Sequence, residues 1–140
     1  MFTLTSENSF DAAHFLHGYN GKCSNIHGHR WRVVVEIYSE TLSDETHTRG
    51  MVVDFDTLKE SIKEEVDYFD HALIIEKGTL KEKTYEALKE EGIRMIEVGF
   101  RTTAENFSKY FFEIFTKKGY QVKRVSVYET PNNCSTYSED

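Results

Sequence analysis

Proline and cysteine are both scarce in this 140-residue sequence. The single proline is Pro131, so most breaks between elements must come from glycine and from helix caps. The two cysteines, Cys23 and Cys134, are too few for the disulfide framework of a small secreted protein, and we interpret both as free thiols. This composition indicates an ordinary folded protein of a reducing compartment.

Long apolar runs and an excess of positive charge are also missing. No apolar stretch approaches the roughly 18 residues that a membrane-spanning helix needs, and the N-terminus lacks the basic and apolar regions of a signal peptide. The 24 acidic residues outnumber the 17 basic ones, which gives a formal net charge of −7. Nucleic-acid binders usually carry a basic face, and none is visible here. We therefore expect a cytoplasmic protein with one domain over 1–140 and neither a membrane nor a nucleic-acid partner.

Hydrophobic periodicity predicts strands at both ends of the chain and helices between them. This order is typical of an α+β fold, in which helices pack on one face of an antiparallel sheet. A small open sheet has edges to protect, so an oligomer is expected. The predicted strands are 2–14, 27–38, 125–129 and 134–137, with a brief extended piece at 95–98; the predicted helices are 55–69, 80–91 and one that starts after Thr102 and ends at Gly119.

Capping residues mark where the helices begin and end. Two Thr-x-x-Glu patterns predict capping boxes, and Glu105 has a structural role as the last residue of the second one. The expected N-caps are Asp54, Thr79 and Thr102, and the expected C-terminal stops are Gly92 and Gly119.

His27 and His29 open the strand over 27–38. Residues at i and i+2 of a strand point to the same face, about 6.5 to 7 Å apart. If the strand over 2–14 pairs with it as a hairpin, His14 comes back beside His29. Three imidazoles with an open fourth position are the pattern of catalytic zinc, which polarises a carbonyl or stabilises an alkoxide. The pattern predicts Zn²⁺ on these residues; the alternative is histidines that only satisfy backbone carbonyls.

Cys23 lies four residues before His27, in a loop that also holds Gly21. A thiol near a cation is more readily deprotonated, and the thiolate is its reactive form, so Cys23 is a candidate base or nucleophile. Two alternatives remain open. Cys23 could complete a closed structural zinc site as a fourth ligand, or it could be a small apolar loop residue.

Three further side chains, Asp70, His71 and Glu129, carry weaker signals. Asp70 can orient the imidazole of His71 as a general acid–base unit, although the pair is also compatible with a plain helix end. Glu129 shares the parity of Val125 and Val127 and is expected to point inward. A carboxylate there requires a cationic or amide-like partner, either an arginine of this chain or the guanidine-like edge of a ligand.

Taken together, the motifs resemble the 6-pyruvoyl-tetrahydropterin synthase superfamily, and within it the bacterial 6-carboxy-tetrahydropterin synthases of queuosine biosynthesis. Thr102 stands where relatives often have proline, which we expect to affect only the start of the helix. The gap between Cys23 and His27 favours the carboxy-tetrahydropterin branch. The matching motifs are Phe10-Asp11-Ala12-Ala13-His14, Gly21-Lys22-Cys23-x-x-x-His27-Gly28-His29, Val53-Asp54-Phe55, Phe69-Asp70-His71, Thr103-Ala104-Glu105-Asn106 and Tyr128-Glu129-Thr130.

The resemblance implies a role for each matched polar residue. It places zinc on the three histidines, proton transfer on the cysteine and the Asp–His pair, and the 2-amino-pyrimidinone edge of a pterin on a glutamate and the start of the last helix. The implied metal ligands are His14, His27 and His29; the catalytic residues are Cys23, Asp70 and His71; the substrate-binding residues are Glu129, Thr103 and Glu105.

The resemblance also implies a fold, an assembly and a reaction. The fold is the tunnelling fold (T-fold), a four-stranded antiparallel sheet with helices on one face; three sheets close a barrel, two trimers stack as a homohexamer, and active sites lie between subunits. The implied reaction is a zinc-dependent lyase reaction that converts 7,8-dihydroneopterin triphosphate to 6-carboxy-5,6,7,8-tetrahydropterin, releasing acetaldehyde and triphosphate. The alternatives are a 6-pyruvoyl-tetrahydropterin synthase or related pterin side-chain lyase and, more distantly, a non-enzymatic zinc-binding module.

Overall fold

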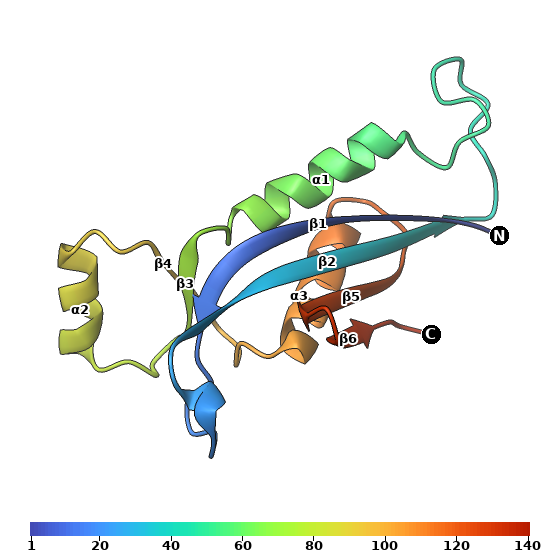
Figure 1. The fold of residues 1–140 in the computed structure, drawn as a ribbon. Helices are drawn as coiled ribbons and strands as arrows, with labels where there is room; N and C mark the ends of the chain where they lie inside the picture. The colour runs from blue at the N-terminus through green and yellow to red at the C-terminus, as the bar shows by residue number, and fades with distance from the viewer.

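The computed structural model describes residues 1–140 as one mixed sheet with helices packed against it (Figure 1). The α+β class expected from the sequence is confirmed. The strands are β1 (Phe2–His14), β2 (His27–Ser39), β3 (Ala72–Glu76), β4 (Met95–Val98), β5 (Val122–Thr130) and β6 (Asn133–Tyr137); the helices are α1 (Phe55–Asp67), α2 (Glu82–Glu90) and α3 (Ala104–Lys117), with a 3-10 turn, η1, at Lys22–Ser24.

The sheet has six strands in the order β4-β3-β1-β2-β5-β6. The part β1-β2-β5-β6 is antiparallel and corresponds to the four-stranded sheet that was expected. That expectation was incomplete, because β3 and β4 extend the sheet from the edge of β1 as parallel strands. Residues 72–75 of β3 are all buried and therefore show no alternation, as is usual for a parallel strand covered on both faces.

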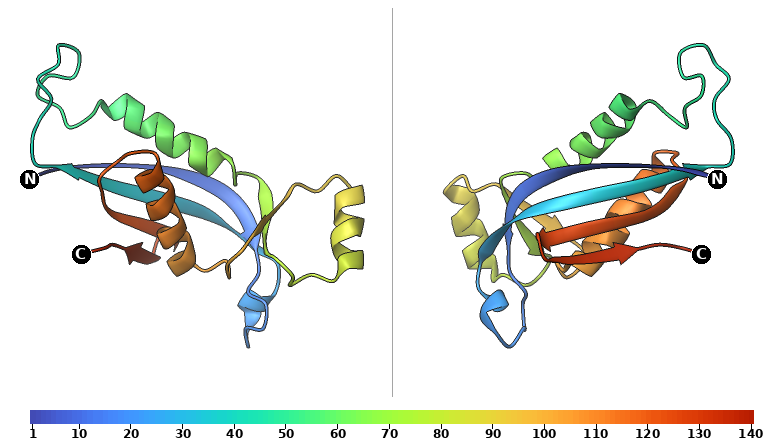
Figure 2. Two further views of the ribbon diagram at one scale, coloured as in Figure 1. Left: turned by 180° about the vertical axis from the view of Figure 1, so that it is seen from behind. Right: turned by 45° about the vertical axis from the view of Figure 1, so that its right-hand side comes forward.

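Helices α1 and α3 lie on one face of the long β1–β2 hairpin, as both views in Figure 2 show. Their apolar sides cover the inward-facing side chains of the sheet and close the main hydrophobic core. None of the helices combines the length and the apolar character that crossing a membrane requires. The largest side chains buried in this core are Trp31, Phe10, Phe69, Phe107, Phe111 and Phe115.

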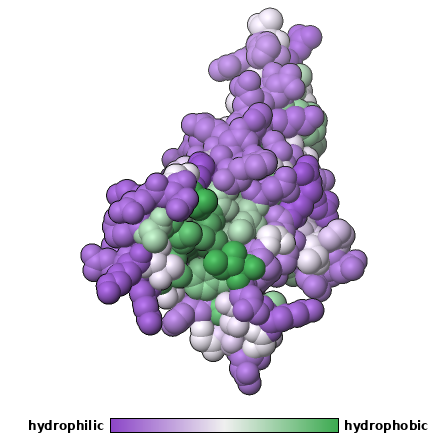
Figure 3. All heavy atoms as spheres, turned by 60° about the vertical axis from the view of Figure 1, so that its left-hand side comes forward, coloured by the Kyte–Doolittle hydropathy of each residue, from purple (hydrophilic) through white to green (hydrophobic).

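Helix α2 stands apart from α1 and α3, at the β3–β4 end of the sheet (Figure 1). Leu80, Tyr85 and Leu88 pack there on a second, smaller cluster around Phe15 and Ile75. On the side of the molecule that carries α2, apolar side chains gather at the surface among polar ones (Figure 3). This end of the protein is therefore packed less completely than the main core.

The N-caps match the expectation at α1 only. The Asp54 carboxylate accepts a hydrogen bond from the Asp56 amide at 2.8 Å, which confirms it as the N-cap of α1. The N-cap of α2 is Lys81 instead of Thr79. The N-cap of α3 is Thr103 instead of Thr102, because Thr102 is buried with its hydroxyl bonded to the Phe15 carbonyl.

The expected stops behave as glycine C-caps do. Gly92 and Gly119 have φ angles of 79° and 100°, the left-handed region in which glycine ends a helix without strain. Because the N-cap of α3 is Thr103, Glu105 is the second residue of the helix and lies one position too early for a capping box. Its predicted structural role is therefore wrong, and its side chain is free for another task.

The aromatic core predicts a large penalty for truncation. Replacing Phe111, which is fully buried, by alanine should lower the free energy of unfolding by about 3–5 kcal/mol, because a cavity replaces a ring that packs on Phe10, Phe69 and Phe115. Urea denaturation followed by circular dichroism measures the change. The matched control is Tyr19→Ala, at a ring that is 48% exposed, where a change of about 0.5 kcal/mol is expected. Equal losses in the two variants would contradict this account of the core.

Candidate metal centre and active site

The β1–β2 hairpin brings three histidines together at the end of its two strands. His14 is the last residue of β1, and His27 is the first residue of β2. The register places His14 opposite His27 and Ala12 opposite His29, so the expected pairing of His14 with His29 is off by two residues. A shift by two keeps every side chain on its own face of the sheet, and for this reason the convergence of the three rings survives.

The donor nitrogens of His14, His27 and His29 lie within 4.8 Å of one another. The Nδ1–H of His14 donates to the Thr102 carbonyl at 2.8 Å, and the Nδ1–H of His27 donates to the Asn25 carbonyl at 2.7 Å. Since a carbonyl only accepts, these contacts place the proton of each neutral ring on Nδ1, and Nε2 is then the nitrogen available to a metal ion. The tautomers are those required of metal ligands oriented by backbone carbonyls.

His14 Nε2 is a buried polar atom with no hydrogen-bond partner. Leaving such a group unpaired in a protein interior is costly unless something satisfies it. A cation bound between the three imidazoles would do so, and the neighbouring donors are of the type that divalent transition metals prefer. The residues present therefore fit a metal ion.

Electrostatics and packing keep the rings of His14 and His29 neutral and hold them in place. Burial, reinforced by the nearby His27 and His29, lowers the pKa of His14 from 6.5 to about 4. Burial and the proximity of His27 also lower the pKa of His29. The indole of Trp31 packs edge-on against His14 and His29, with centroids 4.8 and 5.4 Å away, and its Nε1–H donates to the Ala12 carbonyl. The rings of His14 and His29 are thus neutral and held against the indole of Trp31.

Cys23 and Glu129 line the same cavity as the three histidines, which has a volume of about 500 Å³. Cys23 lies in η1, and its carbonyl accepts a hydrogen bond from the Leu16 amide at 2.8 Å, which ties the loop back to the end of β1. The cysteine is not part of the cluster of donor atoms that the histidines form. The geometry therefore favours a thiol beside the metal position over a fourth ligand.

The Glu129 carboxylate faces the cluster, as its strand parity predicted, with Oε1 3.9 Å from His14 Nε2. Burial raises its pKa and Glu105 raises it further, whereas His27 acts in the opposite direction. Glu105 also lines a smaller hollow shared with Glu129 and Cys134. Thr103 is close by in sequence, but its hydroxyl accepts a hydrogen bond from the Asn106 amide as the cap of α3.

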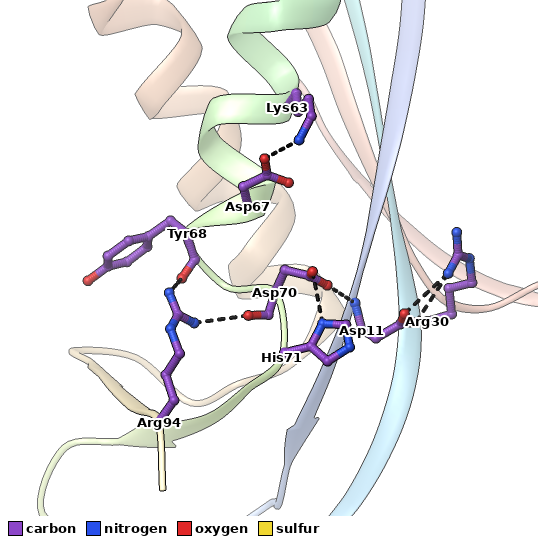
Figure 4. Close-up of polar contacts among 8 residues, drawn as sticks. All are labelled: Asp11, Arg30, Lys63, Asp67, Tyr68, Asp70, His71 and Arg94. Atoms are coloured by element: carbon purple, nitrogen blue, oxygen red, sulfur yellow. Dashed lines mark hydrogen bonds and ion pairs between the residues drawn. The ribbon is translucent and has the colours of Figure 1, made fainter. Parts of the chain in front are cut away.

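Asp70 and His71 lie outside this cavity, in the turn between α1 and β3 (Figure 4). Asp70 Oδ2 accepts from His71 Nδ1 at 2.9 Å, so the two side chains form the expected pair. The hydrogen bond from the Asp11 amide, followed by that from His71, lowers the pKa of Asp70. His71 is 78% exposed and lines an open depression whose one residue in common with the metal cavity is His29. A single chain therefore does not bring Cys23 and His71 into one cavity.

Thr102 is a functional residue that the sequence reasoning missed. Its carbonyl and hydroxyl lie 2.8 and 3.1 Å from His14 Nδ1, so it orients the most buried ligand. The sequence shows only a threonine before a helix, and the distance of 88 positions from His14 hides the contact. Thr102 differs from an ordinary threonine before a helix in being completely buried. Burial is seen only in the tertiary structure, so the sequence carries no signal for this contact.

The environment of His14 has a measurable consequence in the metal-free protein. With its pKa lowered to about 4, His14 should remain neutral on acidification from pH 6.5, where an ordinary histidine takes up its proton. The unfolded chain gains that proton and the folded chain does not, so lowering the pH through this window should also reduce the free energy of unfolding. Imidazole ¹⁵N chemical shifts recorded after chelation of metal measure the titration. A midpoint near 6.5 for His14 would contradict the burial described here.

Comparisons with known proteins show the family to which the chain belongs. The family model described as 6-pyruvoyl tetrahydropterin synthase matches residues 3–140. A Haemophilus influenzae protein named 6-carboxy-5,6,7,8-tetrahydropterin synthase is 34% identical over 99% of this chain and 100% of its own length. An Archaeoglobus fulgidus protein named putative 6-carboxy-5,6,7,8-tetrahydropterin synthase is 36% identical over 86% of this chain and 82% of its own.

Solved structures share the fold. The Caenorhabditis elegans 6-pyruvoyl tetrahydropterin synthase superposes with a TM-score of 0.69 at 26% identity, covering 99% of this chain and 96% of that one. An uncharacterised Wolinella succinogenes protein superposes with a TM-score of 0.79 at 18% identity, covering 99% and 98%. These likenesses confirm the T-fold, and the match over 3–140 spans every motif on which the resemblance rested. The chain belongs to the 6-pyruvoyl tetrahydropterin synthase family.

Proposed function

We propose that this chain is a zinc-dependent lyase that converts 7,8-dihydroneopterin triphosphate and water to 6-carboxy-5,6,7,8-tetrahydropterin, acetaldehyde and triphosphate, as a step of queuosine biosynthesis. The observation that carries the proposal is the cavity in which the three histidine nitrogens, Cys23 and Glu129 face one another. Relatives named 6-carboxy-5,6,7,8-tetrahydropterin synthase support 6-carboxy-tetrahydropterin as the product. We further propose that residues 1–140 act as a single domain.

Zinc is the metal that the donor set favours. His14, His27 and His29 supply three neutral nitrogens and leave a fourth position for substrate, which is the arrangement of catalytic zinc. When bound, zinc supplies Lewis-acid chemistry, which stabilises negative charge on the side-chain oxygens of the pterin. The protein's own part is to keep His14 and His29 neutral and to fix the orientation of the His14 and His27 rings through backbone carbonyls.

Glu129 is proposed to orient the pterin ring. A carboxylate accepts two parallel hydrogen bonds from the adjacent N–H groups of a 2-amino-pyrimidinone edge. Its raised pKa and partial burial fit a carboxylate that gains its best partner only when a ligand binds. Thr103 and Glu105, at the start of α3 beside the hollow that Glu129 lines, are proposed to assist.

Cys23 and His71 are proposed to move the protons. Cys23, as thiolate, takes a proton from the substrate side chain. Asp70 holds His71 through Nδ1 and leaves its Nε2 free to exchange the second proton. Because His71 lies outside the metal cavity, we propose that it serves the site of a neighbouring copy in a homohexamer. The open depression beside His71 is lined in part by the apolar side chains of Leu73 and Ile93, which suits a contact between copies.

Product identity is the first test of this proposal. The zinc-loaded protein incubated with 7,8-dihydroneopterin triphosphate should release acetaldehyde and 6-carboxy-tetrahydropterin, both identified by mass spectrometry. A 6-pyruvoyl product without acetaldehyde would instead establish the sister reaction. An absence of any pterin turnover, together with sulfur in the first coordination shell by X-ray absorption, would favour a non-enzymatic site closed by Cys23.

Mixing two inactive variants tests whether the site is shared between copies. Cys23→Ala and His71→Asn should each lower turnover by about 10²–10⁴-fold, because each removes one proton-transfer group, while the zinc content stays unchanged. Unfolding and refolding the two together should restore about a quarter of the wild-type activity, because one chain then supplies Cys23 and its neighbour supplies His71.

Each variant refolded alone is the control for the mixture. Normal turnover by Cys23→Ala would refute the proposed mechanism. Full loss in both variants without recovery in the mixture would instead place both groups in one chain.

A further inference from the structure

We propose that Arg94 is a positioning residue that holds the turn carrying Asp70 and His71 in the geometry needed for proton transfer. The inference rests on the proposed role of His71. Arg94 belongs to none of the motifs that mark the family resemblance. It precedes β4 and is separated by 24 positions from the turn that it contacts.

The Arg94 guanidinium bridges two carbonyls of this turn. One terminal nitrogen donates to the Tyr68 carbonyl at 2.6 Å, and the other donates to the Asp70 carbonyl at 3.0 Å (Figure 4). A guanidinium is planar, and its donors keep a fixed spacing, so it fixes the two acceptors relative to each other. Tyr68 is also the C-cap of α1, where carbonyls lack helical partners and a cation is favourable.

The turn requires such support because its backbone is strained. His71 has a φ of 56°, and no other residue besides glycine has a positive φ in this chain. A non-glycine residue in that region is sterically strained, so surrounding contacts must hold it there. The strained residue is the one whose imidazole is proposed to exchange the proton.

Two anchors hold the turn from opposite sides. On the sheet side, the His71 amide donates to the Asp11 carbonyl at 2.7 Å, and the Asp11 amide donates to Asp70 Oδ1 at 2.8 Å. Both of these bonds use the backbone of Asp11. On the other side, Arg94 supplies the only side chain from outside the turn that hydrogen-bonds to its backbone. The Arg94 carbonyl in turn accepts from the Leu73 amide at 3.0 Å, which fixes the base of the arginine beside β3.

The charge of Arg94 is directed to carbonyls and not to the Asp70 carboxylate. Its loss should therefore leave Asp70 ionised and change the orientation of the Asp70–His71 pair. Arg94→Met should lower kcat by about 10–100-fold, because small misplacement of a catalytic group is costly. KM for the pterin and the zinc content should stay within about twofold, since Arg94 hydrogen-bonds neither to the proposed metal ligands nor to Glu129.

Steady-state kinetics with chemical rescue test the proposal. Guanidinium ion at millimolar concentration should restore part of the kcat of Arg94→Met, and Arg94→Lys should recover little because one ammonium cannot bridge both carbonyls. The matched control is Lys63→Met, which removes a cation from the same end of α1, where Lys63 pairs with Asp67 (Figure 4). Its kcat should equal that of the wild type.

The outcomes separate this inference from the proposed function. Normal turnover by His71→Asn would refute the role of His71 itself. A large loss in His71→Asn with an unchanged kcat in Arg94→Met would refute positioning by Arg94 alone. A rise in KM equal to the fall in kcat, or no recovery with guanidinium in a variant with wild-type circular dichroism, would also overturn it.

Discussion

The pairing of β1 with β2 is the constraint on which the rest of the candidate site depends. Its register brings the last residue of one strand opposite the first residue of the next, so strand pairing places His14 next to His27 and close to His29. Helices α1 and α3 then cover the same face of the hairpin (Figure 2). The histidine cluster is therefore an extension of the hydrophobic core, with Trp31 between the apolar side chains and the imidazoles.

Placing a histidine at the edge of the core leaves a buried polar atom without a hydrogen bond. His14 is buried with one ring nitrogen satisfied by Thr102 and the other unpaired. The same burial keeps the imidazole neutral, as a metal ligand must be. The protein thus tolerates an unsatisfied atom in the folded chain, and a bound cation would relieve it.

The proposed proton-transfer groups differ from the proposed metal ligands in where they lie and in what holds them. Cys23 is held close to the cluster by a loop that is tied back to β1. Asp70 and His71 lie on a strained turn at the surface, held by Asp11 and Arg94. A buried histidine cluster and an exposed acid–base pair suit the proposed site completed by a second copy, since the exposed pair does not line the cavity of its own chain.

Strand alternation and the i, i+2 spacing of His27 and His29 were enough to predict the antiparallel half of the sheet, the shared face of the histidines and the inward direction of Glu129. Local rules could not predict β3, because a strand buried on both faces has no alternation to detect. They also misplaced the cap of α3, because burial of Thr102 overrides its capping propensity. The contacts of Thr102 with His14, and of Arg94 with the Asp70 turn, join residues far apart in the chain. The sequence by itself determined which side chains are candidates for the chemistry, since residue type and period are local. Only the tertiary structure decided which backbone groups hold these side chains and that His71 lies outside the cavity of the three histidines, because those distances depend on how the separate elements pack.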